Sequence, residues 1–362
     1  MGEPLRIGVV GLGAISGTYL CTLAWFPEVR VTRLADLDPA RAAAAARHAP
    51  GARAVPVGEL MTSQDVDLVL NLTRPAAHAQ IARAALAAGK HVYGEKPLAL
   101  DTGQAHAVLA AAGGLRVGNA PDTALGTGTQ TARRTIEEGH IGTPVAANAA
   151  FVTAGHEAWH PDPDFYYQPG GGPLFDMGPY YLTSLVHLLG PIRRVMGMSS
   201  RSRPERVVGS GPRAGTRIPV GVDTHVAGLL EHDSGAITTL LTSFEAVATR
   251  QPHIEVHGTG GSLIVPDPNG FGGSVMIRRR GDSEWSARPA SAGYQDSGRG
   301  TGVVDLAGSL AAGRPHRASA ELALHVLDVM EALLTAARGQ ASVPVASSCT
   351  LPALVPLGSP GA

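Results

Sequence analysis

A glycine-rich turn near the N-terminus constrains the fold of this chain more than any other feature of its sequence. Residues 11–17 read Gly-Leu-Gly-Ala-Ile-Ser-Gly, and they connect a short apolar run, Leu5–Val10, to an apolar-periodic segment, Ala14–Phe26. A buried strand, a glycine turn and a helix in this order make the first βα unit of folds that bind dinucleotides. The turn therefore predicts a Rossmann domain at the start of the chain.

Several residues of the turn have an expected role in binding a dinucleotide. Gly11 permits the tight turn, and Gly13 lets the backbone approach a pyrophosphate. Ala14 and Ile15 lie at the start of the helix, where backbone N–H groups would hold that pyrophosphate. Ser16 stands where the motif Gly-x-Gly-x-x-Gly has its third glycine, so a generic turn between strand and helix is the alternative.

The first 120 residues alternate between predicted strands and predicted helices. The strands are Leu5–Val10, Val29–Ala35, Asp67–Leu72, His91–Gly94 and Leu115–Gly118. The helices are Ala14–Phe26, Ala40–His48, Ala77–Ala88 and Asp101–Ala112. Strands joined through helices at this spacing form right-handed crossovers and a parallel sheet covered on both faces. We expect an α/β Rossmann domain that binds NAD(P) over residues 1–120, with the active site outside the carboxyl ends of its strands.

After residue 120 strands follow one another with few helices between them. The expected helices are Thr129–Glu138, Pro179–Leu189 and Glu321–Arg338. The expected strands are Val145–Val152, Arg194–Met198, His225–Glu231, Ala236–Phe244, Ile254–Val256, Ser262–Val265 and Val275–Arg279. This pattern predicts an α+β domain with an open, mainly antiparallel sheet over residues 121–362, and exposed loops at 199–218 and 291–302. An open sheet leaves one apolar face uncovered, so we expect a homodimer or homotetramer.

Composition narrows the range of partners. The formal net charge is −1, which lacks the basic excess of proteins that bind nucleic acid or anionic lipid. No apolar run reaches the roughly 18 residues of a membrane span, and no basic segment resembles a signal peptide. Cys21 and Cys349 permit one disulfide at most. These features predict a cytoplasmic protein with reduced thiols that acts on a small molecule.

Asp36 bears on the choice of dinucleotide. It ends the second predicted strand, 19 residues after Gly17. An acidic side chain there binds the adenosine ribose hydroxyls and repels a 2′-phosphate, which favours NAD over NADP. Arg33 and Arg41 lie close in sequence and could neutralise the carboxylate, and Asp36 could also be a simple strand-end residue.

Two further motifs give the chain a specific resemblance. Residues 71–78 read Asn-Leu-Thr-Arg-Pro-Ala-Ala-His, and residues 88–98 read Ala-Gly-Lys-His-Val-Tyr-Gly-Glu-Lys-Pro-Leu. The chain resembles the Gfo/Idh/MocA family of sugar and cyclitol oxidoreductases, in which such segments flank the nicotinamide site. The resemblance implies that Lys96 points at the reacting carbinol and that a cis or strained peptide bond precedes Pro97. It also implies that this region binds the cofactor through Asn71, Thr73, Arg74, His78, Glu95 and Lys96.

A later segment resembles the substrate-binding motif of the same family. Residues 170–181 read Gly-Gly-Gly-Pro-Leu-Phe-Asp-Met-Gly-Pro-Tyr-Tyr. Asp176 matches the family aspartate, whereas Tyr180 stands in place of the family histidine and Thr183 in place of a later aspartate. This variant is similar to the branch that includes sugar 3-ketoreductases. It implies Tyr180 as the acid–base residue, Asp176 as the group that orients the sugar hydroxyls, and Lys96 as an ammonium that favours the phenolate.

The tyrosine assignment has alternatives. Tyr180 could be a core aromatic residue, and the adjacent Tyr181 could fill the role equally well. Trp159 and His160 resemble the Trp-Arg segment of the family, with histidine in place of arginine. With Phe165, Tyr166 and Tyr167 they would form an aromatic wall against a sugar ring, or an aromatic loop packed on its own domain.

Residues 156–160 also spell His-Glu-x-x-His, the signature of zinc proteases. That chemistry requires a continuous helix, so that both histidines bind one Zn²⁺. Gly155 precedes the run, and Pro161 and Pro163 follow it, so a long helix is not expected. We therefore expect no metal site.

The resulting hypothesis is reversible hydride transfer between NAD(P) and a secondary hydroxyl or ketone of a sugar, a cyclitol or a sugar derivative. Two alternatives stay open. The family resemblance includes NAD-dependent glycosidases, which oxidise and re-reduce the sugar within one turnover. A non-catalytic regulatory protein that binds dinucleotide is the other, because the family histidine is replaced.

Overall fold

The computed structural model describes residues 3–360 of the chain. They form two compact units, and neither unit is one continuous stretch. Unit 1 comprises Met1–Thr127, Ala292–Leu324 and Pro352–Ala362, and unit 2 comprises Gly128–Ser291 and His325–Leu351. The first crossing, after residue 127, lies close to the predicted boundary at 120. The two later returns of the chain to unit 1 were not predicted.

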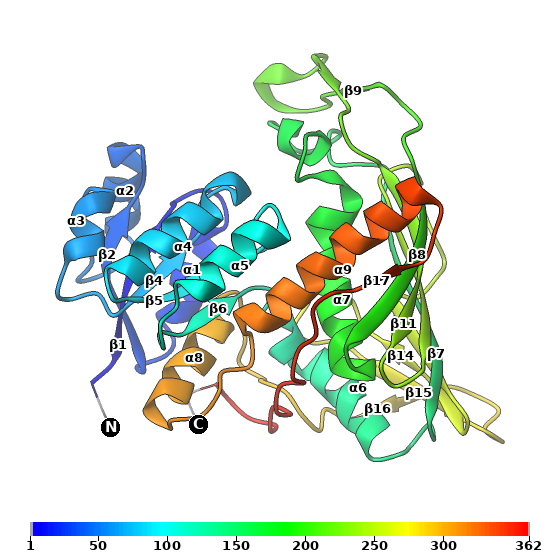
Figure 1. Cartoon of the computed structure of the whole chain (residues 1–362). Helices are drawn as coiled ribbons and strands as arrows, with labels where there is room; N and C mark the ends of the chain where they lie inside the picture. Colours follow the sequence, from blue (N-terminus) through cyan, green and yellow to red (C-terminus); the bar gives the residue numbers. More distant parts are fainter. Residues whose placement is uncertain (1–2, 361–362) are drawn as a thin grey trace. The chain divides into compact units, whose positions relative to one another are not determined.

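Unit 1 is built on a six-stranded parallel sheet (Figure 1). Its strands run in the order β3-β2-β1-β4-β5-β6, the arrangement of the Rossmann fold. They are β1 (Leu5–Val10), β2 (Val29–Ala35), β3 (Arg53–Ala54), β4 (Leu68–Asn71), β5 (His91–Gly94) and β6 (Val117–Asn119). The predicted α/β class is confirmed. Only the two-residue strand β3 was missed.

The helices of unit 1 follow the predicted alternation. They are α1 (Ser16–Leu23), α2 (Pro39–Ala46), α3 (Val57–Thr62), α4 (His78–Ala87), α5 (Thr102–Ala110) and α8 (Thr301–Ala311), with 3₁₀ turns η1 (Pro75–Ala77) and η2 (Thr123–Leu125). The carboxylate of Asp101 caps α5 by accepting from the N–H of Gln104 at 2.7 Å. Neither α3 nor α8 was predicted.

The returning segments complete the core of unit 1. One cluster of buried apolar side chains joins residues of the sheet, such as Ile7 and Tyr93, to Val303 of α8 and to Val355. Arg317 is also buried, and its guanidinium pairs with the fully buried carboxylate of Asp305. The parallel sheet therefore depends on residues more than 170 positions further along the chain for part of its packing.

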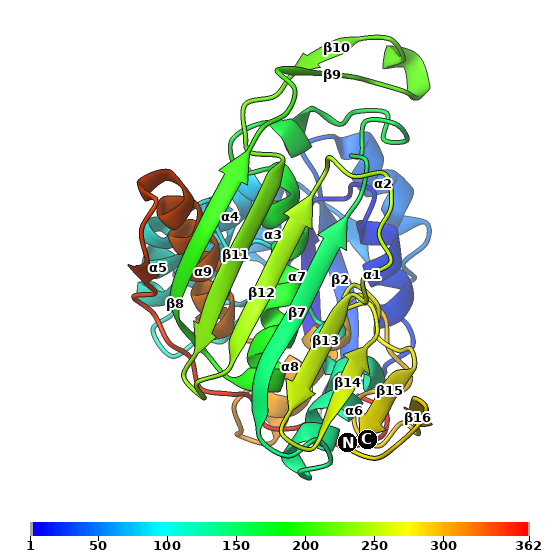
Figure 2. The same ribbon diagram turned by 90° about the vertical axis from the view of Figure 1, so that its right-hand side faces the viewer.

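Unit 2 contains a nine-stranded mixed sheet (Figure 2). Its strands run in the order β16-β15-β14-β13-β7-β12-β11-β8-β17, and every neighbouring pair is antiparallel except β7 and β12. They are β7 (Pro144–Val152), β8 (Ile192–Ser200), β11 (His225–His232), β12 (Ile237–Ser243), β13 (Ile254–Gly258), β14 (Gly261–Val265), β15 (Val275–Arg279), β16 (Ser286–Arg288) and β17 (Val343–Pro344). The predicted open, mainly antiparallel sheet is confirmed.

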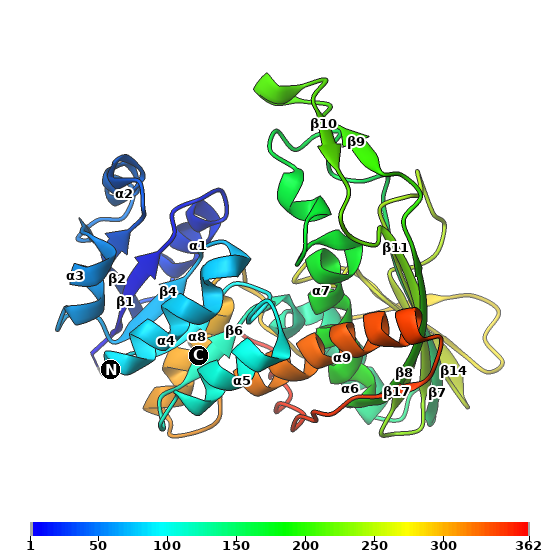
Figure 3. The same ribbon diagram turned by 45° about the horizontal axis from the view of Figure 1, so that its top comes forward.

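Helices lie on one face of this sheet. They are α6 (Thr127–Glu137), α7 (Gly172–Leu189) and α9 (Ala320–Gly339), with 3₁₀ turns η3 (Asp164–Tyr167) and η4 (Gly211–Arg213). Helix α7 packs on β7, β11 and β12 (Figure 3), and Figure 2 shows the opposite face without a helix of unit 2 across it. The predicted helix beginning at Pro179 is seven residues too short. Its first turn contains Pro173, where proline is well tolerated, and Pro179 lies inside the helix.

The segment predicted as an exposed loop, 199–218, contains a small antiparallel ribbon. It consists of β9 (Glu205–Val207) and β10 (Arg217–Pro219). Arg206 on β9 is only 2% exposed, so the prediction of a solvated loop is wrong at this residue. No helix among the described residues is long and apolar enough to cross a membrane.

Candidate functional site

The glycine turn of unit 1 has the geometry that its sequence predicts. Gly11 has a φ of 94°, a value that L side chains rarely adopt. A Cβ atom at Gly11 would lie 2.7 Å from backbone atoms of Leu72 and Thr73, which follow β4. Glycine is therefore required at this position by the fold itself.

Gly13 has a different explanation. A Cβ atom there would meet no atom within 4 Å, so packing within the protein does not require glycine. Helix α1 begins at Ser16 with no side-chain cap and no acidic residue in its first turn. Within residues 3–360, the N–H groups of Gly13, Ala14 and Ile15 donate to no carbonyl or side chain. Open space over unused donors at a helix start fits the pyrophosphate of a dinucleotide.

Asp36 lies beside this turn. Its Oδ2 accepts from the N–H of Leu12 at 2.7 Å and its Oδ1 from the N–H of Asp38 at 2.9 Å, so both oxygens are fixed at the end of β2. Each oxygen keeps a further lone pair for a ribose hydroxyl. The two arginines that could have neutralised Asp36 have other partners. Arg33 pairs with Asp65 at 2.8 Å, and Arg41 lies 3.7 Å from Asp38.

Asn71 and His78 shape the loop after β4. The buried amide of Asn71 donates to the carbonyl of His78 at 3.0 Å and accepts from the hydroxyl of Thr73 at 2.6 Å. The His78 imidazole is also buried, with Nε2 2.9 Å from the carbonyl of Thr73 and Nδ1 2.6 Å from that of Pro97. Asn71 and His78 thus fix the backbone of this loop and of Pro97 through buried hydrogen bonds. Of the other two predicted residues, Thr73 is half-buried and Arg74 is exposed.

The residues around Lys96 are fixed by buried polar groups. Glu95 Oε1 accepts from the hydroxyl of Tyr19 at 2.7 Å, and its Oε2 accepts from the N–H of Lys96 at 3.0 Å. The amide of Asn119 donates to the carbonyls of Gly94 and Glu95 at 3.1 and 3.0 Å. Burial and the Glu95 carboxylate raise the pKa of Tyr19 well above its usual value, so the phenol stays a donor. The Lys96–Pro97 peptide bond is cis, in agreement with the resemblance.

In unit 2, the adjacent residues Tyr180 and Tyr181 of helix α7 have different surroundings. The hydroxyl of Tyr181 lies 2.7 Å from Nδ1 of His253, and its ring is fully buried in the core. Burial raises the pKa of Tyr181 far above the usual range. Tyr180 points from a different side of the helix, four residues after Asp176, a spacing that places both side chains on one face. The hydroxyl of Tyr181 therefore has a partner in unit 2, His253, that is not among the predicted catalytic residues.

The loop before α7 contributes a residue that was not predicted as part of the site. His156 Nε2 lies 2.9 Å from Oδ2 of Asp176, and each side chain is 13% exposed. The sequence did contain a signal, because His156 opens the His-Glu-x-x-His run. That run forms a turn here, as expected, and its side chains have separate partners. Glu157 pairs with Arg206 at 2.9 Å, and His160 Nδ1 accepts from the N–H of Asp162 at 3.1 Å.

The predicted aromatic wall is present in part. Trp159 and Phe165 are 59% and 47% exposed, and the ring of His160 lies 5.4 Å from that of Trp159 and 5.5 Å from that of Phe165. Tyr166 stacks on Phe165 with ring centroids 4.0 Å apart. Tyr167, in contrast, is fully buried beside Phe244, and its hydroxyl donates to Glu157. Its inclusion in the wall was wrong, because its ring belongs to the core.

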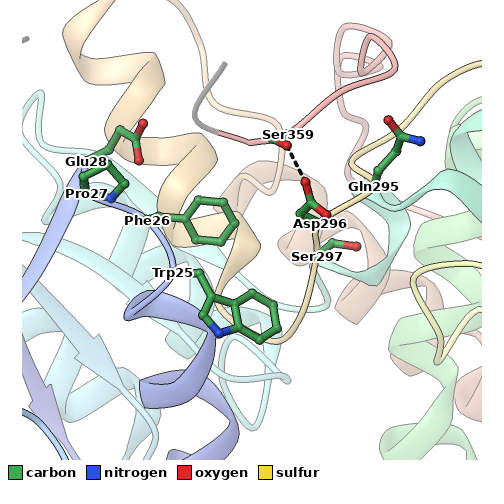
Figure 4. A pocket seen from close by; sticks show the side chains of 8 residues that line it. All are labelled: Trp25, Phe26, Pro27, Glu28, Gln295, Asp296, Ser297 and Ser359. Atoms are coloured by element: carbon green, nitrogen blue, oxygen red, sulfur yellow. Dashed lines mark hydrogen bonds between the residues drawn. The ribbon is translucent and has the colours of Figure 1, made fainter.

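Unit 1 also contains a hollow of about 720 Å³. Trp25 and Phe26 line one part of it, and Asp296, hydrogen-bonded to Ser359 at 2.6 Å, lines another (Figure 4). Residues 25–28 immediately precede β2, so the hollow lies near the amino ends of the strands. Gly11, Asp36 and Glu95 instead follow the carboxyl ends of β1, β2 and β5. The hollow is therefore distinct from the predicted cofactor site.

Known proteins resemble both parts of the chain. Residues 5–117 match the oxidoreductase family with an NAD-binding Rossmann fold, and residues 129–264 match the GFO/IDH/MocA C-terminal domain. A dTDP-3,4-didehydro-2,6-dideoxy-alpha-D-glucose 3-reductase of Streptomyces antibioticus is 32% identical over 281 residues, which are 73% of this chain and 84% of the relative.

Two further comparisons agree with this match. A 1,5-anhydro-D-fructose reductase of Ensifer adhaerens is 28% identical over 295 residues, covering 79% of this chain and 84% of the relative. The solved structure of an NAD binding oxidoreductase from Klebsiella pneumoniae superposes with a TM-score of 0.82 at 26% identity, covering 95% of this chain and 100% of the other. The chain is therefore an oxidoreductase of the GFO/IDH/MocA family.

Proposed function

We propose that this enzyme transfers a hydride between NAD and a secondary hydroxyl or ketone of a sugar or sugar derivative. The observation that carries the proposal is the set of groups at the carboxyl ends of β1, β2 and β5. There Gly11 permits the tight turn, Gly13 leaves room for a pyrophosphate, the Asp36 carboxylate is fixed for a ribose, and Glu95 fixes the backbone of Lys96. Bound nicotinamide would accept or give the hydride.

The protein's own residues supply charge and protons. The Lys96 ammonium stabilises the negative charge that develops on the substrate oxygen as the hydride leaves. Tyr180 takes the hydroxyl proton in oxidation and returns it in reduction. Asp176 accepts hydrogen bonds from neighbouring sugar hydroxyls and so orients the ring. Trp159 and His160 supply an aromatic surface for the C–H face of the sugar.

NAD is favoured over NADP because the Asp36 carboxylate would repel a 2′-phosphate and neither nearby arginine pairs with it. Replacing Asp36 by serine should lower the affinity of the enzyme for NADH by about tenfold. The ratio of its affinities for NADH and NADPH should decrease as well. Titration of protein fluorescence with each reduced coenzyme measures both affinities. Tighter binding of NADPH by the unmodified enzyme would contradict the assignment.

The substrate class follows the chemistry of the relatives, one named for a dTDP-linked deoxysugar and another for an anhydro-sugar. The direct test incubates the enzyme with NAD⁺ or NADP⁺ and a panel of free, anhydro- and nucleotide-linked sugars while nicotinamide absorbance is followed. Coenzyme reduction with at least one sugar is expected. Hydrolysis of an aryl glycoside without net coenzyme change would show the glycosidase reaction instead.

The roles of Lys96 and Tyr180 are tested by substitution. Lys96→Met and Tyr180→Phe should each lower kcat by about 100-fold or more with NADH affinity largely kept. Tyr181→Phe is the matched control, because its hydroxyl is hydrogen-bonded to His253. An unchanged kcat in Tyr180→Phe would remove this residue from the proton transfer.

We also propose that a second copy of the chain covers the outer face of the nine-stranded sheet. Four apolar side chains from neighbouring strands are about half exposed or more on it: Met196, Met198, Leu229 and Ile237. Such a surface favours self-association. Light scattering should give at least a dimer, and Met198→Glu should shift the distribution towards the monomer. A monomeric wild-type protein at micromolar concentration would exclude this interface.

A further inference from the structure

The loop that carries His156 is fixed by a buried ionic network. The side chain of Arg206 is 1% exposed. Its guanidinium donates to the carboxylates of Glu157 and Glu245 at 2.9 and 2.7 Å and to the carbonyls of Ala154 and Phe244, each at 3.1 Å. Two of these acceptors belong to the residues on either side of the Gly155–His156 pair. The backbone of His156 is therefore held in one place.

Gly155 strengthens this constraint. Its φ is 105°, and a Cβ atom there would collide with the Glu157 carboxylate and the Tyr167 hydroxyl. The N–H of Gly155 donates to the hydroxyl of Thr153 at 2.9 Å, and that of His156 donates to the hydroxyl of Tyr167 at 3.3 Å. The turn is thus built around close polar contacts that no other residue at 155 would permit.

Aromatic rings fix the imidazole of His156 itself. The rings of Tyr166, Phe244 and Trp159 lie 4.5, 4.7 and 5.2 Å from it, all edge-on. This arrangement leaves Nε2 directed at Oδ2 of Asp176, 2.9 Å away. This contact thus joins the loop to the helix face that also carries Tyr180.

The partners of the two ring nitrogens indicate which one carries the proton. Nδ1 of His156 is buried and has no hydrogen-bond partner among the described residues. A proton on Nδ1 would be a buried donor without an acceptor, which is unfavourable, whereas an unprotonated nitrogen is only an unused acceptor. A proton on Nε2 is satisfied by Asp176. Besides Asp176, the charged groups of this loop and its ionic network are Glu157, which pairs with Arg206, and Glu245, which pairs with the same guanidinium.

We propose that His156 is a positioning residue for the reaction. As the neutral Nε2–H tautomer it donates to Asp176 and so fixes the orientation of that carboxylate as an acceptor for substrate hydroxyls. Tyr180 stands on α7 at the position of the family histidine, whereas His156 comes from the loop before α7. The inference rests on the proposed function for its catalytic consequence, but the His156–Asp176 pair can be tested without turnover.

The first experiment reads the tautomer directly. Two-bond ¹H–¹⁵N correlation spectra distinguish Nε2–H, Nδ1–H and imidazolium forms of histidine. The His156 signal, identified by its loss in His156→Phe, should show the neutral Nε2–H form at pH 7.5 and should shift in Asp176→Asn. An imidazolium or an Nδ1–H form would overturn the proposal, whether or not any sugar is turned over.

The second experiment separates hydrogen bonding from packing. His156→Phe keeps an aromatic ring among Trp159, Tyr166 and Phe244 but loses the donor, whereas His156→Gln keeps an amide donor near the position of Nε2. His156→Phe should lower kcat/KM about 10- to 100-fold with unchanged NADH affinity, the loss expected for one hydrogen bond to a charged group. His156→Gln should recover most of that loss.

The two variants also exclude a merely structural effect. Both should keep the wild-type thermal midpoint within a few degrees, and the loss in His156→Phe should fall mainly on kcat. Equal damage in both variants, or activity of His156→Phe within twofold of wild type, would overturn the positioning role. If the wild-type enzyme oxidises and reduces no sugar, the proposed function fails, and the spectra alone decide the state of the pair.

Discussion

The two units fix their candidate functional residues in different ways. In unit 1, the groups around Lys96 come from the ends of neighbouring parallel strands, and short loops fix them through Asn71, Glu95 and Asn119. In unit 2, Asp176 is oriented by a loop that is held by Arg206, from a strand 30 residues later in the chain. Strand topology brings the groups around Lys96 together, whereas a buried ionic network fixes the loop that contacts Asp176.

The largest expected effect comes from breaking that network. Arg206→Met leaves the carboxylates of Glu157 and Glu245 buried without their cation, which should lower the free energy of unfolding by about 3–5 kcal/mol. Urea denaturation measures the loss. Arg217→Met is the matched control, because Arg217 pairs with Glu205 on the same ribbon but is 75% exposed, so its loss should be small. Similar losses in both variants would show that burial of Arg206 is unimportant.

A smaller effect is expected from the glycine turn of unit 1. Gly11→Ala forces a Cβ atom against the backbone after β4 at a φ of 94°, which should cost about 3 kcal/mol in stability. Gly13→Ala should leave the free energy of unfolding within about 0.5 kcal/mol of wild type but weaken NADH binding. Thermal unfolding and coenzyme titration measure the two quantities. Unchanged NADH affinity in Gly13→Ala would argue against a pyrophosphate over this turn.

Two buried tyrosines of unit 1 provide a finer comparison. Tyr19→Phe removes the donor to Glu95 and should cost about 2 kcal/mol, with a lower kcat because Glu95 also holds Lys96. Tyr93→Phe should cost little, because the buried hydroxyl of Tyr93 has no partner among the described residues. Urea denaturation compares the two variants. A larger loss in Tyr93→Phe would contradict the assigned hydrogen bonds.

The smallest expected effect is a dependence of stability on pH. Burial lowers the pKa of His316 in unit 1 and of His232 in unit 2. In the unfolded chain both histidines take up a proton near pH 6.5, whereas in the folded protein their pKa values are lower. The free energy of unfolding should therefore fall as the pH drops from about 6.5 through the pKa values of the folded state. His232→Gln and His316→Gln should each flatten this fall between pH 7 and 5. An unchanged slope in both would assign the effect to other groups.

Most of the fold could be predicted from local sequence signals. Strands β1, β2, β5 and β15 have the predicted bounds, because short apolar runs between turn residues depend mainly on their own composition. Helix α7 was predicted to begin at Pro179, because prolines and glycines before it resemble a loop. Helix α8 was missed because its glycines weaken the helical pattern. Gly302 is explained only by Tyr93, whose ring leaves no room for a side chain.

The residues of the candidate site also fall into those that local motifs predict and those that depend on tertiary contacts. The glycine turn, Asp36 and the Glu-Lys-Pro strand end follow from motifs that carry their own geometry. The pairing of His156 with Asp176 does not, because it depends on tertiary contacts that no spacing encodes. Arg206 was missed for the same reason, since an arginine in a glycine-rich segment resembles a solvated residue until Glu157 and Glu245 are placed beside it.

The late return of the chain to unit 1 has a consequence for its biosynthesis. Val355 is fully buried in the core beneath the parallel sheet, together with Val303 and Leu306 of α8. The ribosome makes the glycine turn and Lys96 hundreds of residues before this last contact is available. The dinucleotide-binding unit therefore cannot reach its final packing until the chain has been synthesised past Val355. A fragment cut at residue 120 would expose apolar side chains that the intact protein covers.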